Sequence, residues 1–314
     1  IGEYMNNYVI GAGVAGLTLA MYDTNFKIFD DNPLGLLKNK YTLGPRLLQY
    51  NKWTREFFFM YEELLGFLGK VRINTAQIGF SENHFIADDA SEGFKKKYSK
   101  ITRNREDYEH SFLSAGKNSI DHFIFDGCED NYIELFKRME RLIRSRGQII
   151  DAKVQNINLN KKTIVDSNNV KYDYDNLVST IPVTILFSIL GKEIPHLDFS
   201  TNKKHFYIAE YNSINEQTSK KYAYVYSVDG KYTRKTFFKD YITFETVEHH
   251  DAAIIDGCKI IDAKENFPIQ ITKSHNIQDV NEIYMLGRLA QWRHDIRFDT
   301  LPEIITKIRE HIYG

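Results

Sequence analysis

The chain has 314 residues, of which 42% are hydrophobic and 26% charged, and its 41 lysines and arginines nearly balance its 42 aspartates and glutamates. This length can bury a large core in one or two interleaved domains, and the composition indicates neither disorder nor a repeat array. The balanced charge leaves no global field that would attract nucleic acid or an anionic membrane, so such a partner would have to meet a local patch.

Membrane and metal signals are missing from the sequence pattern. No apolar run approaches the ~18 residues of a membrane span, and the chain does not start with a secretory signal pattern. Cys128 and Cys258 lie far apart, and the ten histidines form no metal-binding motif. We therefore expect a soluble, cytoplasmic protein with no metal site. The basic cluster Lys95-Lys96-Lys97 leaves a local contact with nucleic acid open, although such clusters are usually solvated surface.

The start of the chain carries a glycine-rich turn between an apolar strand and a helix. Residues 8–10 run into Gly11-Ala12-Gly13-Val14-Ala15-Gly16 and an apolar helical segment, which is the pattern of a dinucleotide-binding βαβ unit. Gly11 allows a tight turn, Gly13 lets a pyrophosphate approach the backbone, and Gly16 lets the helix pack closely on the sheet. The positive end of that helix would face the phosphates. The residues expected to contact the dinucleotide are Gly11, Gly13, Val14, Ala15 and Gly16.

Two acidic residues follow the next apolar run. Residues 26–29 lead into Asp30 and Asp31, about 20 residues after the first glycine, where a carboxylate normally accepts hydrogen bonds from the ribose hydroxyls. Asp30 is the stronger candidate because it directly follows the strand, and its charge disfavours a bound 2′-phosphate. The alternative is that both acids only cap a turn before Pro33.

The middle of the chain alternates between helical and strand-like patterns. Apolar residues at helical spacing predict helices over 53–68 and 130–147, with Gly147 as the C-terminal stop of the second. Residues 88–118 are polar and charged, which indicates a solvated excursion, with a mobile lid as the alternative. Short strands are expected over 154–159, 163–165 and 170–172, followed by a buried strand over 174–182 and a helix over 183–190.

From residue 205 to 247 the pattern changes to a period of two, which predicts an antiparallel sheet inserted into an α/β protein. Asp229-Gly230 has the chemistry of a hairpin turn. A strand over 282–288 and a helix over 301–312 close the chain, and Thr300-Leu301-Pro302-Glu303 has the spacing of a capping box. The 20 Tyr and 21 Phe could line a pocket for a flat ring or a sugar, or could simply build the core.

Four segments spread over the chain carry a family resemblance. They are Val9–Ala20, Gly44-Pro45-Arg46-Leu47-Leu48-Gln49, the strand Asp173–Pro182, and Phe267-Pro268-Ile269 together with Leu286-Gly287-Arg288-Leu289-Ala290-Gln291-Trp292-Arg293. In this order they resemble the FAD-containing superfamily of amine oxidases and UDP-galactopyranose mutase, with the mutase branch the more similar. The first segment is shared with many flavoproteins, whereas the last is comparatively specific.

The resemblance implies FAD as the cofactor, with its ADP half held by the N-terminal unit. Val154 would contact the adenine through its backbone, and Thr180, in the Thr-x-Pro turn, would also lie at the cofactor. Gly287 and Arg288 would meet the pyrophosphate and the ribityl chain. Only one glycine fingerprint is present, so a separate NADPH-binding domain is not expected.

The predicted architecture is α/β: a Rossmann-like FAD-binding domain with an inserted antiparallel β-sheet and a small helical substrate region. The FAD-binding domain would be discontinuous, with a helical or lid insertion at 51–119 and the sheet at 201–264 on the substrate side. Its three parts would be residues 1–50, 120–200 and 265–314.

The chain departs from the mutase pattern beside the expected flavin. Arg46 replaces the histidine that follows Gly-Pro in the mutases, and Gln49 replaces a second histidine of that loop. Trp292 stands where the family has an aromatic residue, and His294 replaces the tyrosine two residues later. The resemblance therefore supports the fold and FAD better than it supports a particular substrate.

Two activities fit these residues. The favoured one is flavin N5 chemistry, an oxidation or a lyase-type C–N or C–H cleavage, on an amine-bearing or nucleotide-linked small molecule. Here Arg46 would bind a substrate carboxylate or phosphate and His294 would act as the general base. The alternative is a UDP-sugar mutase that uses reduced FAD, in which Arg46, Arg288 and Arg293 supply the donors for the diphosphate.

Less specific roles remain open for the same residues. Arg46 could pair with the FAD phosphates or with a surface acid, and His294 could be bonded within its turn. A third possibility for the whole chain is an FAD-binding protein without turnover.

Overall fold

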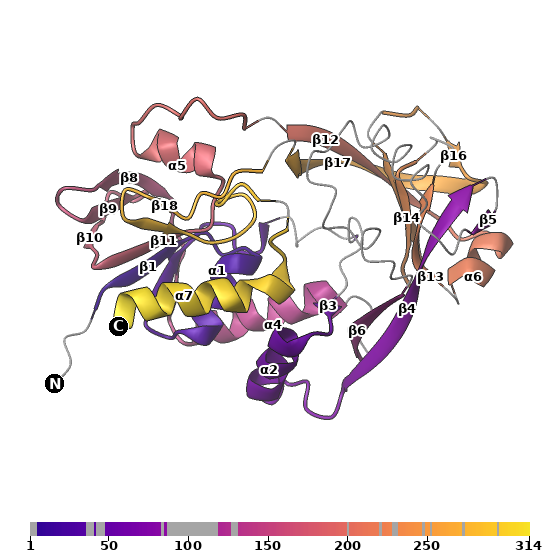
Figure 1. Ribbon diagram of the computed structural model, residues 1–314, viewed down its shortest axis with the longest axis horizontal. Coiled ribbons are helices and arrows are strands. Elements are labelled where there is room, and N and C mark those ends of the chain that lie inside the picture. The colour runs from indigo at the N-terminus through magenta and orange to yellow at the C-terminus, as the bar shows by residue number, and fades with distance from the viewer. Residues whose placement is uncertain are drawn as a thin grey trace.

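The computed structural model describes residues 5–35, 41, 48–82, 85–86, 119–126, 131–199, 201–219, 222–227, 232–246, 249–251, 253–271, 274–293 and 295–314. Within these ranges, no helix combines the length and the apolar character that crossing a membrane demands. Figure 1 shows an α/β layer built from both ends of the chain beside a large curved sheet.

A six-stranded sheet forms the centre of the α/β layer. Its order is β18-β19-β11-β1-β2-β7, and all neighbours are parallel except β18 and β19. Because these strands are covered on both faces, they are mostly apolar and buried. The strands are β1 (Asn7–Ile10), β2 (Phe26–Phe29), β7 (Ile149–Ile150), β11 (Asn176–Ser179), β18 (Asp279–Val280) and β19 (Ile283–Met285). This is the Rossmann-like unit predicted from the glycine turn.

Helices cover one face of this sheet. In Figure 1, α1, α4 and α7 lie together on that side, and the short α2 and the 3₁₀ helix η3 adjoin them. Their buried residues form one continuous core with the strands, including Val9, Leu17, Phe136 and Ile305, each 0% exposed. The bounds are α1 (Val14–Tyr22), α2 (Lys52–Tyr61), α4 (Asn131–Ser145), η3 (Phe298–Thr300) and α7 (Leu301–Tyr313).

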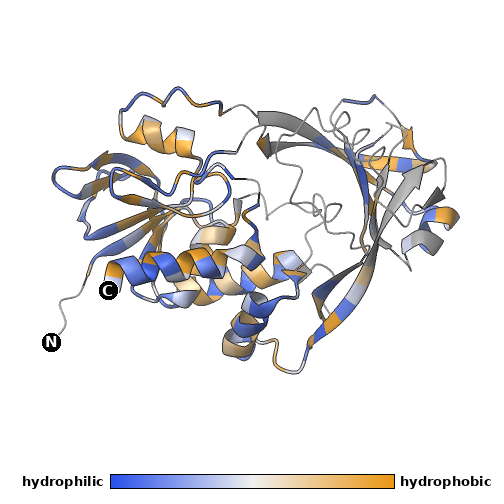
Figure 2. Cartoon of the chain, in the orientation of Figure 1, coloured by the Kyte–Doolittle hydropathy of each residue, from blue (hydrophilic) through white to orange (hydrophobic). Residues whose placement is uncertain are grey.

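The opposite face is covered by a small antiparallel sheet, ordered β10-β9-β8, and by one helix. Figure 2 shows α5 as a predominantly hydrophobic segment, consistent with its role in the second core, where Val183 and Leu186 are 0% exposed. The elements are β8 (Val154–Asn158), β9 (Thr163–Asp166), β10 (Lys171–Asp173) and α5 (Val183–Ile189). All four agree with the sequence prediction to within two residues.

The large curved sheet has the order β16-β17-β12-β15-β14-β13-β4-β6-β3, with β5 added to β4. It contains the antiparallel strands predicted from the period-two pattern, and the short helix α6 lies on its outer side in Figure 1. The elements are β3 (Leu48–Gln49), β4 (Val71–Glu82), β5 (Phe85–Ile86), β6 (Ser119–Phe125), β12 (Thr201–Ala209), α6 (Ser213–Ser219), β13 (Tyr222–Ser227), β14 (Arg234–Phe237), β15 (Ile242–Thr246), β16 (Ile254–Ile255) and β17 (Cys258–Ile271).

The sequence patterns missed the strands that the sheet takes from the first half of the chain, β3, β4, β5 and β6. β4 and β6 pair with each other, and β4 also pairs in parallel with β13. Where the structure describes the segment predicted as a helical or lid insertion, it forms α2 and then the long strand β4, which joins the sheet. The pairing of β4 with β13 joins residues about 145 positions apart, and no local pattern predicts such a contact. The division of the chain into domains stays a prediction.

Two helix boundaries also differ from expectation. The helix predicted over 53–68 ends at Tyr61, and the turns that follow place Gly66 and Gly69 at φ +70° and +71°, a left-handed backbone that helices do not continue through. The Thr300 side chain does not cap α7. Its hydroxyl instead accepts a hydrogen bond from the Arg297 N–H (3.0 Å) in the 3₁₀ turn before the helix.

Candidate functional site

The glycine turn between β1 and α1 is tightly closed. Gly11 has φ +104°, and a Cβ there would lie 2.5 Å from the Thr180 hydroxyl. A Cβ at Gly16 would lie only 1.9 Å from the Gly11 carbonyl oxygen. Both positions therefore require glycine, one for its backbone angle and the other for the close packing of α1 against the end of β1.

Gly13 has the opposite environment. Its φ of −79° is ordinary, and a Cβ built there would meet no heavy atom within 4 Å. It is the N-cap of α1, so the backbone N–H groups of the first helical turn, including those of Val14 and Ala15, point past it. Open space in front of helix N–H donors is the arrangement that accommodates a pyrophosphate.

Asp30 holds the glycine turn in shape. One carboxylate oxygen, Oδ2, accepts a hydrogen bond from the Ala12 N–H at 2.6 Å, and Oδ1 accepts one from the Asn32 N–H at 2.7 Å. Asp30 is partly buried, while Asp31 pairs at 3.2 Å with Lys153 near the surface. The structure thus distinguishes the two acids, with Asp30 adjoining the turn, as a ribose-binding carboxylate requires.

Val154 and Thr180 occupy different places around the same turn. The Asp31–Lys153 pair brings the start of β8 beside the end of β2, and Val154 is buried there at 7% exposure. The Thr180 hydroxyl lies 2.9 Å from the Ile10 carbonyl oxygen and 3.0 Å from that of Gly11, and donates to them. Thr180 therefore joins the ends of β11 and β1, and its contact with a cofactor stays a prediction.

The C-terminal turn after β19 meets the N-terminal one. Gly287 has φ +104°, and a Cβ there would lie 2.9 Å from the Ala15 Cβ at the start of α1. The Leu286 N–H donates to the Ser179 carbonyl oxygen at 2.9 Å, which fixes the turn beside β11. Arg288 follows with an exposed side chain. The two ends of the polypeptide are thus assembled around one place, as the resemblance implies.

Arg293 is engaged within its own turn. Its Nε donates to Asp295 Oδ1 at 3.0 Å, its Nη2 bonds the other oxygen of the same carboxylate, and its Nη1 donates to Asn276 Oδ1 at 3.3 Å. The hydrogen bonds to Asp295 raise the pKa of the guanidinium further above its ordinary value. This forked pair supports a role in shaping the turn, and a catalytic role for Arg293 stays a prediction.

Several predicted residues lie outside the described ranges. These include the candidate catalytic residues Arg46 and His294, together with the Gly44-Pro45 dipeptide. The predicted excursion at 88–118 with its three lysines, the Asp229-Gly230 turn and Cys128 also lie there. Among the described residues, no group of three or more His, Cys, Asp or Glu side chains is placed to hold a metal ion.

Two buried polar atoms lie on the segments that meet at the junction, one at the end of β11 and one in the turn that follows Gly287. The indole N–H of Trp292 and the hydroxyl of Ser179 have no hydrogen-bond partner among the described residues, although their side chains are 4% and 0% exposed. Trp292 also has φ +52°, unusual for a large residue. Buried donors are rarely left unpaired, and strained backbone gathers at functional sites. The residues present therefore fit a dinucleotide cradle that extends past Gly287.

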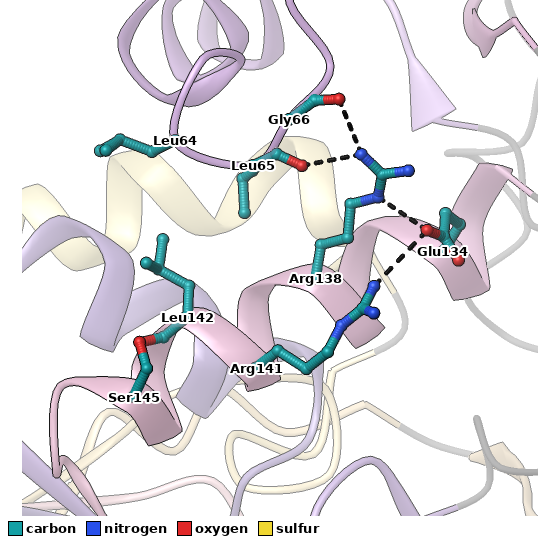
Figure 3. A pocket seen from close by; sticks show the side chains of 8 residues that line it. All are labelled: Leu64, Leu65, Gly66, Glu134, Arg138, Arg141, Leu142 and Ser145. Carbon is teal, nitrogen blue, oxygen red and sulfur yellow. Dashed lines mark hydrogen bonds and ion pairs between the residues drawn. The ribbon is translucent and has the colours of Figure 1, made fainter.

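A separate pocket of about 520 Å³ lies between α4 and the turns after α2 (Figure 3). Arg138 crosses it, and its Nη1 donates to the carbonyl oxygens of Leu65 and Gly66 at 2.9 and 2.8 Å, while its Nε donates to Glu134. These bonds hold the turn that ends α2. None of the lining residues belongs to the glycine turn or to the turn after β19, so this pocket is not the cofactor site.

The curved sheet adds a polar group that the sequence patterns did not reveal. Arg234 on β14 and Glu245 on β15 are directly opposite each other, and their side chains form an ion pair. Glu245 is 3% exposed. Only the register between the two strands brings these residues together, which is why a motif search does not find them.

The comparisons with known proteins establish the fold class. No family model and no curated protein sequence matches the chain. Among solved structures, reduced UDP-galactopyranose mutase superposes with a TM-score of 0.65 at 11% identity, covering 99% of this chain and 96% of the mutase. A putrescine oxidase variant gives 0.59 at 10% identity, covering 98% of each chain. Tar14, a flavin-dependent tryptophan C-6 halogenase, gives 0.58 at 12% identity, covering 99% of this chain and 72% of the halogenase.

These likenesses confirm the predicted α/β architecture with its inserted antiparallel sheet. They include a mutase, an oxidase and a halogenase, so the shared feature is the fold and not one reaction. At identities of 10–12% these likenesses show the fold alone, and the resemblance to the mutase family stays a prediction.

Proposed function

We propose that the protein binds FAD and is a flavoenzyme. The observation that carries this proposal is the junction at Ala15, where the turn that follows β19 closes onto the helix that follows the glycine fingerprint. The open space at Gly13 suits the pyrophosphate, and Asp30 suits the ribose. The similar structures include a flavin-dependent halogenase and a flavoprotein, which supports flavin over another dinucleotide.

The residues around the junction have separable tasks. Val14 and Ala15 offer backbone N–H donors to the phosphates, and Gly287 lets the second turn approach those donors. Trp292 lies five residues past Gly287, and its buried indole packs against Phe199. When bound, the isoalloxazine would supply hydride or electron-pair transfer, while the protein orients the substrate and excludes water.

For the reaction, we propose oxidation or lyase-type cleavage of an amine-bearing or nucleotide-linked small molecule. The departures at Arg46 and Gln49 beside the expected flavin separate this chain from the mutase pattern. In this proposal Arg46 binds an anionic group of the substrate and His294 accepts a proton from it. The second candidate is the UDP-sugar mutase, whose sequence pattern the four segments of this chain resemble in the same order.

One experiment separates these reactions. The FAD-loaded protein is mixed without oxygen with a panel of amines and amino acids, and the flavin absorbance is followed. The oxidation proposal expects bleaching by at least one amine. A mutase would bleach with none, would require prior reduction, and would convert UDP-galactopyranose without net redox change. Loaded protein that does neither would be a binding protein without turnover.

A further inference from the structure

The two faces of the curved sheet carry different groups. Residues opposite each other on neighbouring strands share a face. Lys235 and Phe244 share the outer face with Tyr207, in the cluster that includes Cys258. Arg234 and Glu245 share the other face with Phe206 on β12. We call this second face the inner face, defined by Phe206, Ile208, Tyr224, Arg234, Thr236, Thr243 and Glu245.

The inner face points toward the dinucleotide-binding layer. Tyr41 belongs to the connection that leaves β2 of that layer, and it packs against Phe206 and Ile208 together with Tyr241. The rings of Tyr41 and Tyr241 are 5.0 Å apart. In Figure 1, α6 lies beyond the opposite side of the sheet, away from the α/β layer. A substrate held between the flavin and the sheet would therefore meet the inner face.

The ion pair on this face is not explained by stability. Replacing a buried ion pair by apolar residues of similar size is often neutral or stabilising, because the desolvation of two charges offsets their attraction. Thr243 beside it has a buried hydroxyl, 1% exposed, with no hydrogen-bond partner among the described residues. A buried ion pair beside an unpartnered hydroxyl, on a face that points toward the dinucleotide-binding layer, points to a ligand.

The exposure of the two partners indicates which one meets that ligand. The Glu245 side chain is 3% exposed, whereas the Arg234 side chain is 19% exposed. Arg234 is thus the more accessible member of the pair, and the buried Glu245 carboxylate fixes the position of its guanidinium. The Arg234 guanidinium also lies 5.8 Å from the centre of the Tyr224 ring, which limits its orientation further. A fixed guanidinium suits carboxylates and phosphates, whose oxygens match its planar set of donors.

We propose that Arg234, positioned by Glu245, binds an oxyanion of the substrate, a carboxylate or a phosphate, on the inner face of the sheet. This inference rests on the proposed function, because the flavin defines that face as the substrate side. It assigns anion recognition to a described residue independently of Arg46. Glu245 is a positioning residue, since it acts through Arg234.

The test uses the full chain loaded with FAD and two matched pairs of probes. Uridine 5′-monophosphate is compared with uridine, and phenylacetate with phenylacetamide, by isothermal titration calorimetry. Wild type should bind at least one anion about tenfold or more tightly than its neutral match, as expected for a charge-assisted contact. Preference within the first pair identifies a phosphate, and preference within the second identifies a carboxylate.

The double variant removes the pair without leaving a buried charge. Arg234→Met/Glu245→Leu should abolish the preference for the anion while keeping FAD content and secondary structure. Glu245→Gln should reduce the preference several-fold although Arg234 is still present, a change that a purely structural role for Glu245 would not produce. The matched control is Lys235→Met, which removes the neighbouring buried cation on the outer face, bonded to Asp256 and Asn215, and should keep the preference.

Three results would overturn the inference. Wild type could bind both members of each pair equally, the double variant could retain the preference, or Lys235→Met could abolish it to the same extent. A failure of the proposed function looks different: the protein would take up no FAD, whatever its preference among the probes.

Discussion

Replacing Gly16 and Gly13 one at a time should separate the needs of the fold from those of the cofactor. In Gly16→Ala the new Cβ would lie 1.9 Å from the Gly11 carbonyl oxygen, whereas ordinary contacts begin at 3.4 Å. The helix α1 would have to move by about 1.5 Å from the end of β1, and its residues Leu17 and Leu19 are 0% exposed. We expect a loss of about 3 kcal/mol in the free energy of unfolding, the upper end for overpacked cores.

Gly13→Ser is the matched comparison, because its Cβ meets no atom within 4 Å and serine is a favoured N-cap residue. The apoprotein should keep its stability to within about 0.5 kcal/mol, yet FAD affinity should fall at least tenfold because the side chain fills the space in front of the helix. Urea unfolding of both apoproteins and titration with FAD measure the two quantities. A Gly13→Ser protein that retains full FAD affinity would refute the placement of the pyrophosphate.

Three further outcomes follow from the same contacts. Gly287→Ala combines φ +104° with a 2.9 Å contact to the Ala15 Cβ, so it should lower the free energy of unfolding by about 1–3 kcal/mol and weaken FAD binding. Gly69→Ala, at φ +71° with nothing within 4 Å, should also lower stability but leave FAD binding unchanged. Equal FAD affinities in the two variants would contradict this. Asp30→Asn should lower FAD affinity about tenfold through the lost charged acceptor, and unchanged affinity in a calorimetric titration would remove Asp30 from the ribose site. Burial raises the pKa of the Cys258 thiol, so its alkylation at pH 8 should be slow in the folded protein and fast only after unfolding. A Cys128→Ser background leaves Cys258 as the thiol that is measured. Rapid alkylation of the native protein would contradict the buried position of Cys258.

Local patterns were enough to predict the α/β layer. The glycine turn, the apolar strands and the helix after Thr300 each have a pattern that is complete within about a dozen residues. The resemblance also implied that Gly287 lies at the pyrophosphate near the opening glycines, but its contact with Ala15 is known only from the structure.

The period-two pattern predicted the antiparallel part of the curved sheet, but the addition of β4 and the polar pair required information that the sequence does not carry locally. Arg234 and Glu245 meet only because β14 and β15 align in one particular register, and β4 joins β13 across a long separation. Thr300 was predicted wrongly for another reason. The capping-box spacing is present, but the Thr300 hydroxyl accepts a hydrogen bond from the Arg297 N–H in the 3₁₀ turn and does not cap α7. Asp30 was predicted as a ribose ligand, but its bond to the Ala12 N–H depends on the three-dimensional closure of the turn.

The most direct measurement is the visible spectrum of the purified full-length protein, followed by release and mass analysis of any bound nucleotide. We predict a yellow protein with the two bands of oxidised flavin and about one FAD for each chain. A colourless protein that takes up no added FAD would contradict the assembly of a flavin site from the two ends of this chain.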